Sequence, residues 1–96
     1  MAEKPTFRID GASFSDLRGF FDEIESQLLQ SEPWGRSLDG LDDILRGDVG
    51  PLPTEFRLVW EHADLSRRRL GTSGRGSFTE LVELIAAHQN VELVLS

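Results

Sequence analysis

Two aspartates, Asp39 and Asp43, are spaced so that their carboxylates can act together. Four positions of separation place two side chains one turn apart on the same side of an α-helix. Paired carboxylates accept charge-assisted hydrogen bonds from arginine or lysine, much as a phosphate does. A general acid and base pair needs two different environments, whereas these acids are predicted to be equally exposed on one helix. The spacing therefore favours recognition of a cationic surface over catalysis, and we expect no enzymatic activity.

The segment around these acids is predicted to be a short amphipathic helix. Ser37 is a good N-cap residue and Gly47 a good residue to follow the last turn. Within the helix, Gly40 costs about 1 kcal/mol relative to alanine, and like charges one turn apart cost a few tenths more. The apolar stripe comprises Leu38, Leu41, Ile44 and Leu45, and the opposite side carries Asp39, Asp42, Asp43 and Arg46. A segment selected for stability alone would not have this composition.

The charge balance indicates the kind of partner. The chain has 96 residues, with 17 acidic against 10 basic ones and a formal net charge of −7. Its first fifty residues hold eleven of the acids and five of the bases, so the negative field belongs to that half. The run 67–69 is the one cluster of arginines, which argues against direct binding of nucleic acid. A protein partner with a positive surface is favoured instead.

The remaining composition narrows the class of protein. A chain of this length predicts a single domain over residues 1–96. It has no cysteine, and His62 and His88 are isolated from each other, so neither a metal site nor a cofactor is predicted. The start of the sequence is polar and no apolar run is long enough to span a bilayer. We therefore expect a cytoplasmic protein that does not bind membranes.

Hydrophobic periodicity predicts the elements that position the acidic helix. Alternating or apolar runs predict three strands, and helical spacing with capping boxes predicts helices between them. Strands that are separated by helices imply crossover connections, and hence an α/β fold with a small parallel sheet. The predicted strands are 7–10, 56–60 and 91–95; the helices are one opened by Ser13 and Asp16 and ended by 31–33, a weakly patterned one over 61–70, and one opened by Ser77 and Glu80.

The sequence resembles the barstar family, intracellular inhibitors of guanyl-specific extracellular ribonucleases. The shared pattern is aromatic-Gly-x-x-Leu-Asp-x-Leu-x-Asp-x-Leu-x-Gly, which runs here from Trp34 to Gly47, and the order of elements also fits. The resemblance implies a barstar-like, three-stranded parallel sheet packed with about four helices. It also implies a 1:1 complex in which the acidic helix and the loop before it block a cationic ribonuclease active site, with Asp43 and Asp39 as the principal acids.

The resemblance extends the partner-binding set and also shows departures from the family. Pro33 stands in place of an aromatic residue, Arg46 in place of a small hydroxyl residue, and Asp42 and Asp48 each in place of a tryptophan. The family has a further acidic residue on the last helix, and it aligns with Glu83 or with Leu84, depending on where a one-residue gap is placed. The predicted partner-binding residues are Asp39, Asp43, Pro33, Trp34, Gly35, Ser37, Leu38, Gly40, Asp42, Arg46, Gly47 and Glu83.

Several alternatives stay open at the level of sequence. At several positions of the acidic segment this sequence has a charged residue where the family has an apolar one. These departures favour a different guanyl-specific ribonuclease, or another toxin with a cationic cleft, as the target. A non-inhibitory interaction or immunity module that binds another basic protein is the alternative function. Trp34 is as well suited to core packing as to partner contact, whereas Trp60, at the end of a predicted strand, is expected in the core.

Overall fold

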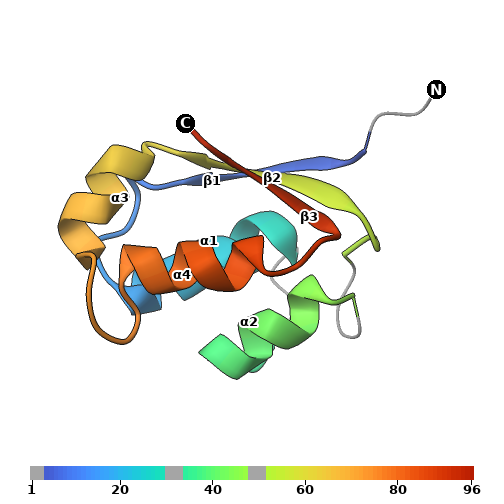
Figure 1. Ribbon diagram of the computed structural model, residues 1–96, viewed down its shortest axis with the longest axis horizontal. Helices are drawn as coiled ribbons and strands as arrows, with labels where there is room; N and C mark the ends of the chain where they lie inside the picture. The colour runs from blue at the N-terminus through green and yellow to red at the C-terminus, as the bar shows by residue number, and fades with distance from the viewer. Residues whose placement is uncertain (1–3, 30–33, 48–51) are drawn as a thin grey trace.

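The computed structural model describes residues 4–29, 34–47 and 52–96. Three strands form one sheet, with α1, α4 and α2 gathered on one side of it and α3 at the end where β2 stops (Figure 1). This arrangement confirms the predicted α/β fold with a parallel sheet and four helices. The elements are β1 (Thr6–Asp10), α1 (Leu17–Leu28), α2 (Leu38–Leu45), β2 (Phe56–Glu61), α3 (Ala63–Leu70), α4 (Phe78–Ala86) and β3 (Val91–Leu95).

The central strand is β2, which pairs in parallel with β1 on one side and with β3 on the other. Trp60 pairs with Ile9 of β1 and with Leu95 of β3. All three predicted strands are therefore confirmed, with bounds one residue longer at the start of β1 and at the end of β2. Because each strand returns to the sheet through helical connections, the helices pack over one face and bury it.

The first helix begins later than its sequence predicted. The N-cap is Asp16, whose carboxylate accepts the N–H of Gly19 at 2.8 Å. Ser13 instead donates its hydroxyl to the carbonyl of Asp10 at 2.8 Å, in the turn that follows β1. The prediction of Ser13 as the helix opener was therefore wrong by one turn, because Ser13 is engaged with Asp10 and Asp16 is itself the N-cap. Phe14 is buried ahead of the helix, and not within it.

The later helices match their predicted capping signals more closely. Ser77 caps α4 by accepting the N–H of Glu80 at 3.2 Å. The Glu80 carboxylate accepts the backbone N–H of Gly76, one residue before the cap. In the predicted capping box it would instead accept the backbone N–H of Ser77, the cap residue itself. The weakly patterned segment after β2 forms α3, which His62 opens in a left-handed conformation with φ at 55°.

The core is centred on Trp60, which is fully buried as predicted. Its ring lies 5.0 Å from that of Phe78 and 5.3 Å from that of Phe20, measured between centroids. These contacts join β2 to both α1 and α4. Aromatic pairs at such distances add about 0.5–1.5 kcal/mol each beyond the burial of their apolar surface. The sheet and the two long helices therefore form one packed platform.

The polar atom of Trp60 is satisfied by a buried serine. The indole N–H donates to Ser66 Oγ at 2.9 Å, and the Ser66 hydroxyl donates to the carbonyl of Gly11 at 3.1 Å. Ser66 is fully buried, and a Cβ on Gly11 would lie only 2.3 Å from Ser66 Oγ. One hydroxyl thus links β2 and α3 to the turn after β1.

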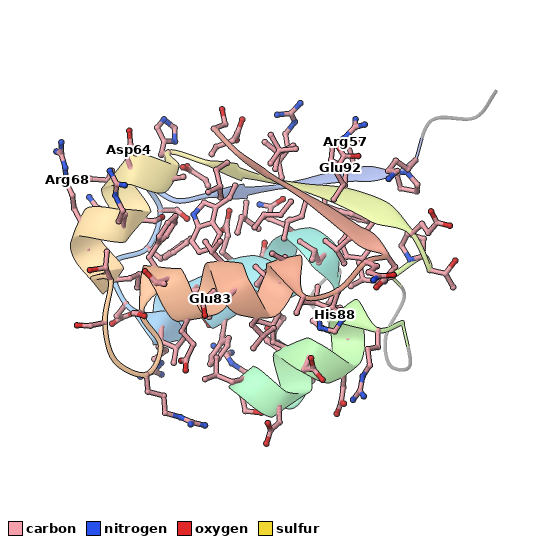
Figure 2. The ribbon with its side chains drawn as sticks, in the orientation of Figure 1. Arg57, Asp64, Arg68, Glu83, His88 and Glu92 are labelled. Carbon is pink, nitrogen blue, oxygen red and sulfur yellow. The ribbon has the colours of Figure 1, made fainter. Side chains whose placement is uncertain are left out.

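The outer face of the sheet is covered by charged side chains. Arg57 and Glu92 stand side by side on it (Figure 2), with Arg57 Nε 3.2 Å from Glu92 Oε2. Lys4 Nζ lies 3.3 Å from the other oxygen of Glu92. The hydrogen bonds from Arg57 and then from Lys4 hold the pKa of Glu92 below its ordinary value. These ion pairs occupy a face that helices cover in most parallel sheets.

Replacing Ser66 by alanine is expected to lower the free energy of unfolding by about 1–3 kcal/mol, because the Trp60 indole and the Gly11 carbonyl both lose their buried partner. Urea denaturation measures this loss. Ser73→Ala, in the exposed turn before α4, is the control and should stay within about 0.5 kcal/mol. Equal stability of the Ser66 and Ser73 variants would contradict the role of the hydroxyl.

Candidate functional site

The candidate site is built on α2, whose apolar side is anchored in the core. Leu41 and Leu45 are fully buried and Ile44 is 1% exposed. Leu38 is partly buried and packs against the same cluster. The predicted apolar stripe is therefore confirmed. Because this side is buried, the polar side chains of the helix lie outside the core.

The three aspartates of α2 do not share one environment. Asp39 is exposed and lies in the first turn of the helix. The Asp43 side chain is 49% exposed, and its carboxylate pairs with Arg46 one turn on. The Asp42 side chain is 42% exposed, with Oδ1 at 2.8 Å from His88 Nε2 of the chain segment after α4. Asp39 and Asp43 thus form the outward pair, while Asp42 is turned toward the body of the protein.

Both ends of α2 are capped by the residues that the sequence indicated. Ser37 Oγ accepts the N–H of Gly40 at 2.9 Å. Gly47 follows the last turn with φ at +84°, and its N–H donates to the carbonyl of Ile44 at 3.1 Å. A residue with a side chain is strained at that φ, whereas glycine is not. The bounds of the acidic helix are therefore set locally.

Gly40 has a packing role that the sequence did not reveal. A Cβ at this position would lie 3.2 Å from the Cα of Gly35 and 3.3 Å from Ser37 Oγ. The loop before α2 therefore folds back against the first turn of the helix, and the glycine allows the close approach. Gly35 itself is exposed. The pair of glycines brings this loop and the acidic face into one continuous surface.

The sequence left two roles open for Trp34, core packing and partner contact, and the structure shows the first of them. It is half-buried and packs on the core, with its ring centroid 5.4 Å from that of Phe21 in an edge-to-face arrangement. Its indole nitrogen is buried and has no hydrogen-bond partner among the described residues. The core-packing role is therefore present. Pro33, also predicted to contact the partner, lies outside the described residues.

Arg36 was missed by sequence reasoning and ties the loop before α2 to α1. Its guanidinium pairs with Asp22 and lies 3.7 Å from Glu25 Oε1. Its backbone is left-handed, with φ at 46°. The partners lie fourteen and eleven positions away, so no local pattern could have indicated them. Together with Leu17, Arg18 and Phe21, the Arg36–Asp22 pair lines an open hollow beside this loop.

Arg46 lies between two acids of its own helix. Its Nη2 is 3.4 Å from Asp42 Oδ2 and pairs also with Asp43. The Arg46 side chain is 52% exposed. The candidate surface is therefore mixed in charge at the C-terminal end of α2.

His88 and Asn90 were also missed, and they join the end of α4 to α2. His88 is a helix-terminal histidine directly after the C-cap of α4, and its side chain is 9% exposed and meets Asp42, a contact that the sequence did not indicate. Asn90 donates its amide to the carbonyl of Leu45 at 2.8 Å. Figure 2 shows His88 at the end of α4, next to α2. His62 is likewise paired, 2.9 Å from Asp10, at the opposite end of the sheet.

Glu83 and Leu84 are the two positions that can correspond to the family's acidic residue on the last helix. Glu83 is exposed on α4 (Figure 2), which packs beside α2. Leu84 is half-buried and packs against the core cluster. Of the two positions, only Glu83 offers a carboxylate at the surface.

The sequence matches the model of a known protein family. The family model of Barstar, the barnase inhibitor, matches residues 4–95, and the chain belongs to this family. The family is one of protein inhibitors and its partner is a ribonuclease. A search of curated proteins found no match.

In the described part of the chain, no group of three or more histidine, cysteine, aspartate or glutamate side chains is placed to hold a metal ion. Among the helices of residues 4–29, 34–47 and 52–96, none is both long enough and apolar enough to cross a membrane.

Replacing Ser37 by alanine is expected to lower the free energy of unfolding by about 1 kcal/mol, because the N–H of Gly40 loses its capping acceptor. Ser37→Asn keeps an acceptor and should retain nearly all of the stability. Urea denaturation of the two variants measures the difference. A Ser37→Ala protein as stable as the original would show that this cap does not hold α2.

Proposed function

We propose that this protein inhibits a guanyl-specific ribonuclease by placing α2, and the loop before it, in the enzyme's cationic active site. The observation that carries the proposal is the outward pair Asp39 and Asp43 on a helix whose other side is buried. Membership of the Barstar family supports a barnase-inhibitor-like role. The target is bound as a 1:1 complex, in which α2 and the residues before it fill the site that RNA would occupy.

The carboxylates of Asp39 and Asp43 act as substitutes for RNA phosphates. An active site that cleaves RNA must hold phosphate oxygens with cationic donors, and a carboxylate offers the same donors two anionic acceptors. Burial of Leu41 and Leu45 fixes the helix before binding, so little conformational freedom is lost when the complex forms. Arg46 already holds Asp43 in a defined position, which further limits that loss.

The rest of the proposed contact surface surrounds the acidic pair. Ser37, Leu38 and Gly40 form the first turn of α2 behind Asp39, and Gly35 brings the preceding loop against it. Glu83 extends the acidic character onto α4. Asp42, Arg46 and Gly47 lie at the other end of the helix, and there the surface offers charge in place of the apolar contacts typical of the family.

A non-inhibitory module that binds another basic protein is the competing function, and the mixed charge around Arg46 is what favours it. Titration of ribonuclease activity against the protein separates the two. Stoichiometric loss of RNA cleavage by a guanyl-specific ribonuclease such as barnase supports inhibition. Binding that leaves RNA cleavage intact supports the module.

Asp43→Ala is expected to weaken the complex with the ribonuclease by about 2–5 kcal/mol, a range that comes from charge pairs of this same inhibitor family. Removing the acid leaves a buried cation of the enzyme unpaired, so dissociation should become faster while association changes little. Asp39→Ala should behave in the same way. Stopped-flow association and competition-monitored dissociation measure both rates.

Asp64→Ala is the matched control for these variants. It removes the same charge from an 89% exposed side chain on α3, away from α2 (Figure 2). Its affinity should stay within about threefold of the original, because distant exposed charges are screened. If Asp64→Ala and Asp43→Ala weakened binding equally, net charge and not the helix face would be responsible.

The association rate is expected to fall steeply with salt. The net charge of −7 and the concentration of acids in the first half of the chain attract a cationic cleft over distances that screening limits to about 8 Å at physiological ionic strength. Raising the salt concentration from 0.05 to 0.5 M should slow association by about tenfold or more. An association rate that does not respond to salt would contradict electrostatic attraction.

A further inference from the structure

We propose that His88 is a positioning residue for the acidic face of α2, acting through Asp42. This inference rests on the proposed function. His88 follows α4 in the chain, and Asp42 lies on α2, so the pair joins two elements that are far apart in sequence. The His88 side chain is 9% exposed, so most of the imidazole is covered by the protein itself.

The need for such a contact follows from the length of α2. A helix of eight residues is marginal by itself in water, and α2 contains an interior glycine and three aspartates. Its buried leucines and isoleucine hold it against the core. Apolar contacts are not directional, so they fix depth better than they fix rotation about the helix axis. A hydrogen bond with a defined angle supplies the missing constraint.

Two polar contacts from the segment after α4 provide that constraint. His88 Nε2 lies 2.8 Å from Asp42 Oδ1, and Asn90 Nδ2 donates to the carbonyl of Leu45 at 2.8 Å. The second bond satisfies the carbonyl of Leu45, which lies in the last turn and receives no hydrogen bond within the helix. The segment is itself fixed, because the N–H of His88 donates to Ile85 and the N–H of Val91 donates to the carbonyl of His88.

The constraint is passed from Asp42 to the outward face. While Asp42 Oδ1 meets His88, Oδ2 lies 3.4 Å from Arg46, and Arg46 pairs in turn with Asp43. Four side chains therefore form a continuous polar chain from the end of α4 to the acid proposed to bind the ribonuclease. Both oxygens of Asp42 are engaged within the protein. We assign Asp42 to this chain in addition to its place at the edge of the proposed contact surface.

The test compares His88→Ala, His88→Gln and the control His62→Asn. Glutamine retains a donor at a reach similar to that of Nε2, whereas alanine does not. His62→Asn removes the other histidine, whose partner Asp10 lies at the far end of the sheet, and asparagine tolerates its left-handed backbone. Two quantities are measured for each variant: amide hydrogen exchange of residues 38–47 and the dissociation rate from barnase.

His88→Ala is expected to raise exchange in residues 38–47 by about tenfold while exchange in α1 changes little, and to speed dissociation by a similar factor. His88→Gln should restore both to within about threefold, and His62→Asn should change neither. Combining His88→Ala with Asp42→Ala should weaken binding no more than the stronger single variant does, since both remove the same contact.

The exchange measurement separates failure of this inference from failure of the proposed function. If the unaltered protein does not inhibit barnase or another guanyl-specific ribonuclease, the proposed function fails, and the exchange of residues 38–47 in His88→Ala still decides whether His88 holds α2. Unchanged exchange in that variant would overturn the positioning role. So would additive losses of affinity in the double variant, or a His88→Gln variant as impaired as His88→Ala.

Discussion

Burial of one side of α2 is the interaction on which the candidate site depends. Full burial of a leucine or isoleucine side chain contributes about 1.5–3 kcal/mol, and α2 buries three of them, Leu41, Ile44 and Leu45. The costs that the unusual composition of α2 adds are smaller: about 1 kcal/mol for Gly40 and a few tenths for each like-charge pair one turn apart. Burial therefore wins, and the helix can carry a concentration of acids that its own propensity would not support. The apolar stripe has to face the core, and the acids on the other side of α2 therefore face outward.

The remainder of the fold gives this helix a rigid base. The aromatic cluster around Trp60 joins β2 to α1 and α4, and α2 packs on α4 as the helix farthest from the sheet (Figure 1). Polar contacts then set the orientation of α2: Arg36 ties the preceding loop to α1, and His88 and Asn90 tie the last turns to the segment after α4. Burial of the apolar stripe supplies stability and turns the acids outward, while the directional bonds further restrict the orientation of α2.

Much of this could be predicted from the sequence, because the signals are local. The apolar stripe of α2, its caps Ser37 and Gly47, and the parallel direction of the strands all follow from spacing and residue type, and all are confirmed. The polar links could not be predicted in this way. Arg36 meets Asp22, and His88 meets Asp42, across separations that no period connects. The predicted start of α1 was wrong for a different reason, since Asp16, taken as the second member of a capping box opened by Ser13, is itself the N-cap.

The central claim is that Asp39 and Asp43 take the place of RNA phosphates in a cationic cleft. A crystal structure of the protein bound to a guanyl-specific ribonuclease tests it most directly, through the distances from these two carboxylates to the arginine and lysine side chains of the active site. The account predicts distances of about 2.7–2.9 Å for both acids, with the cleft closed to RNA. A complex in which both carboxylates face solvent, or in which the protein binds away from the cleft, would contradict it.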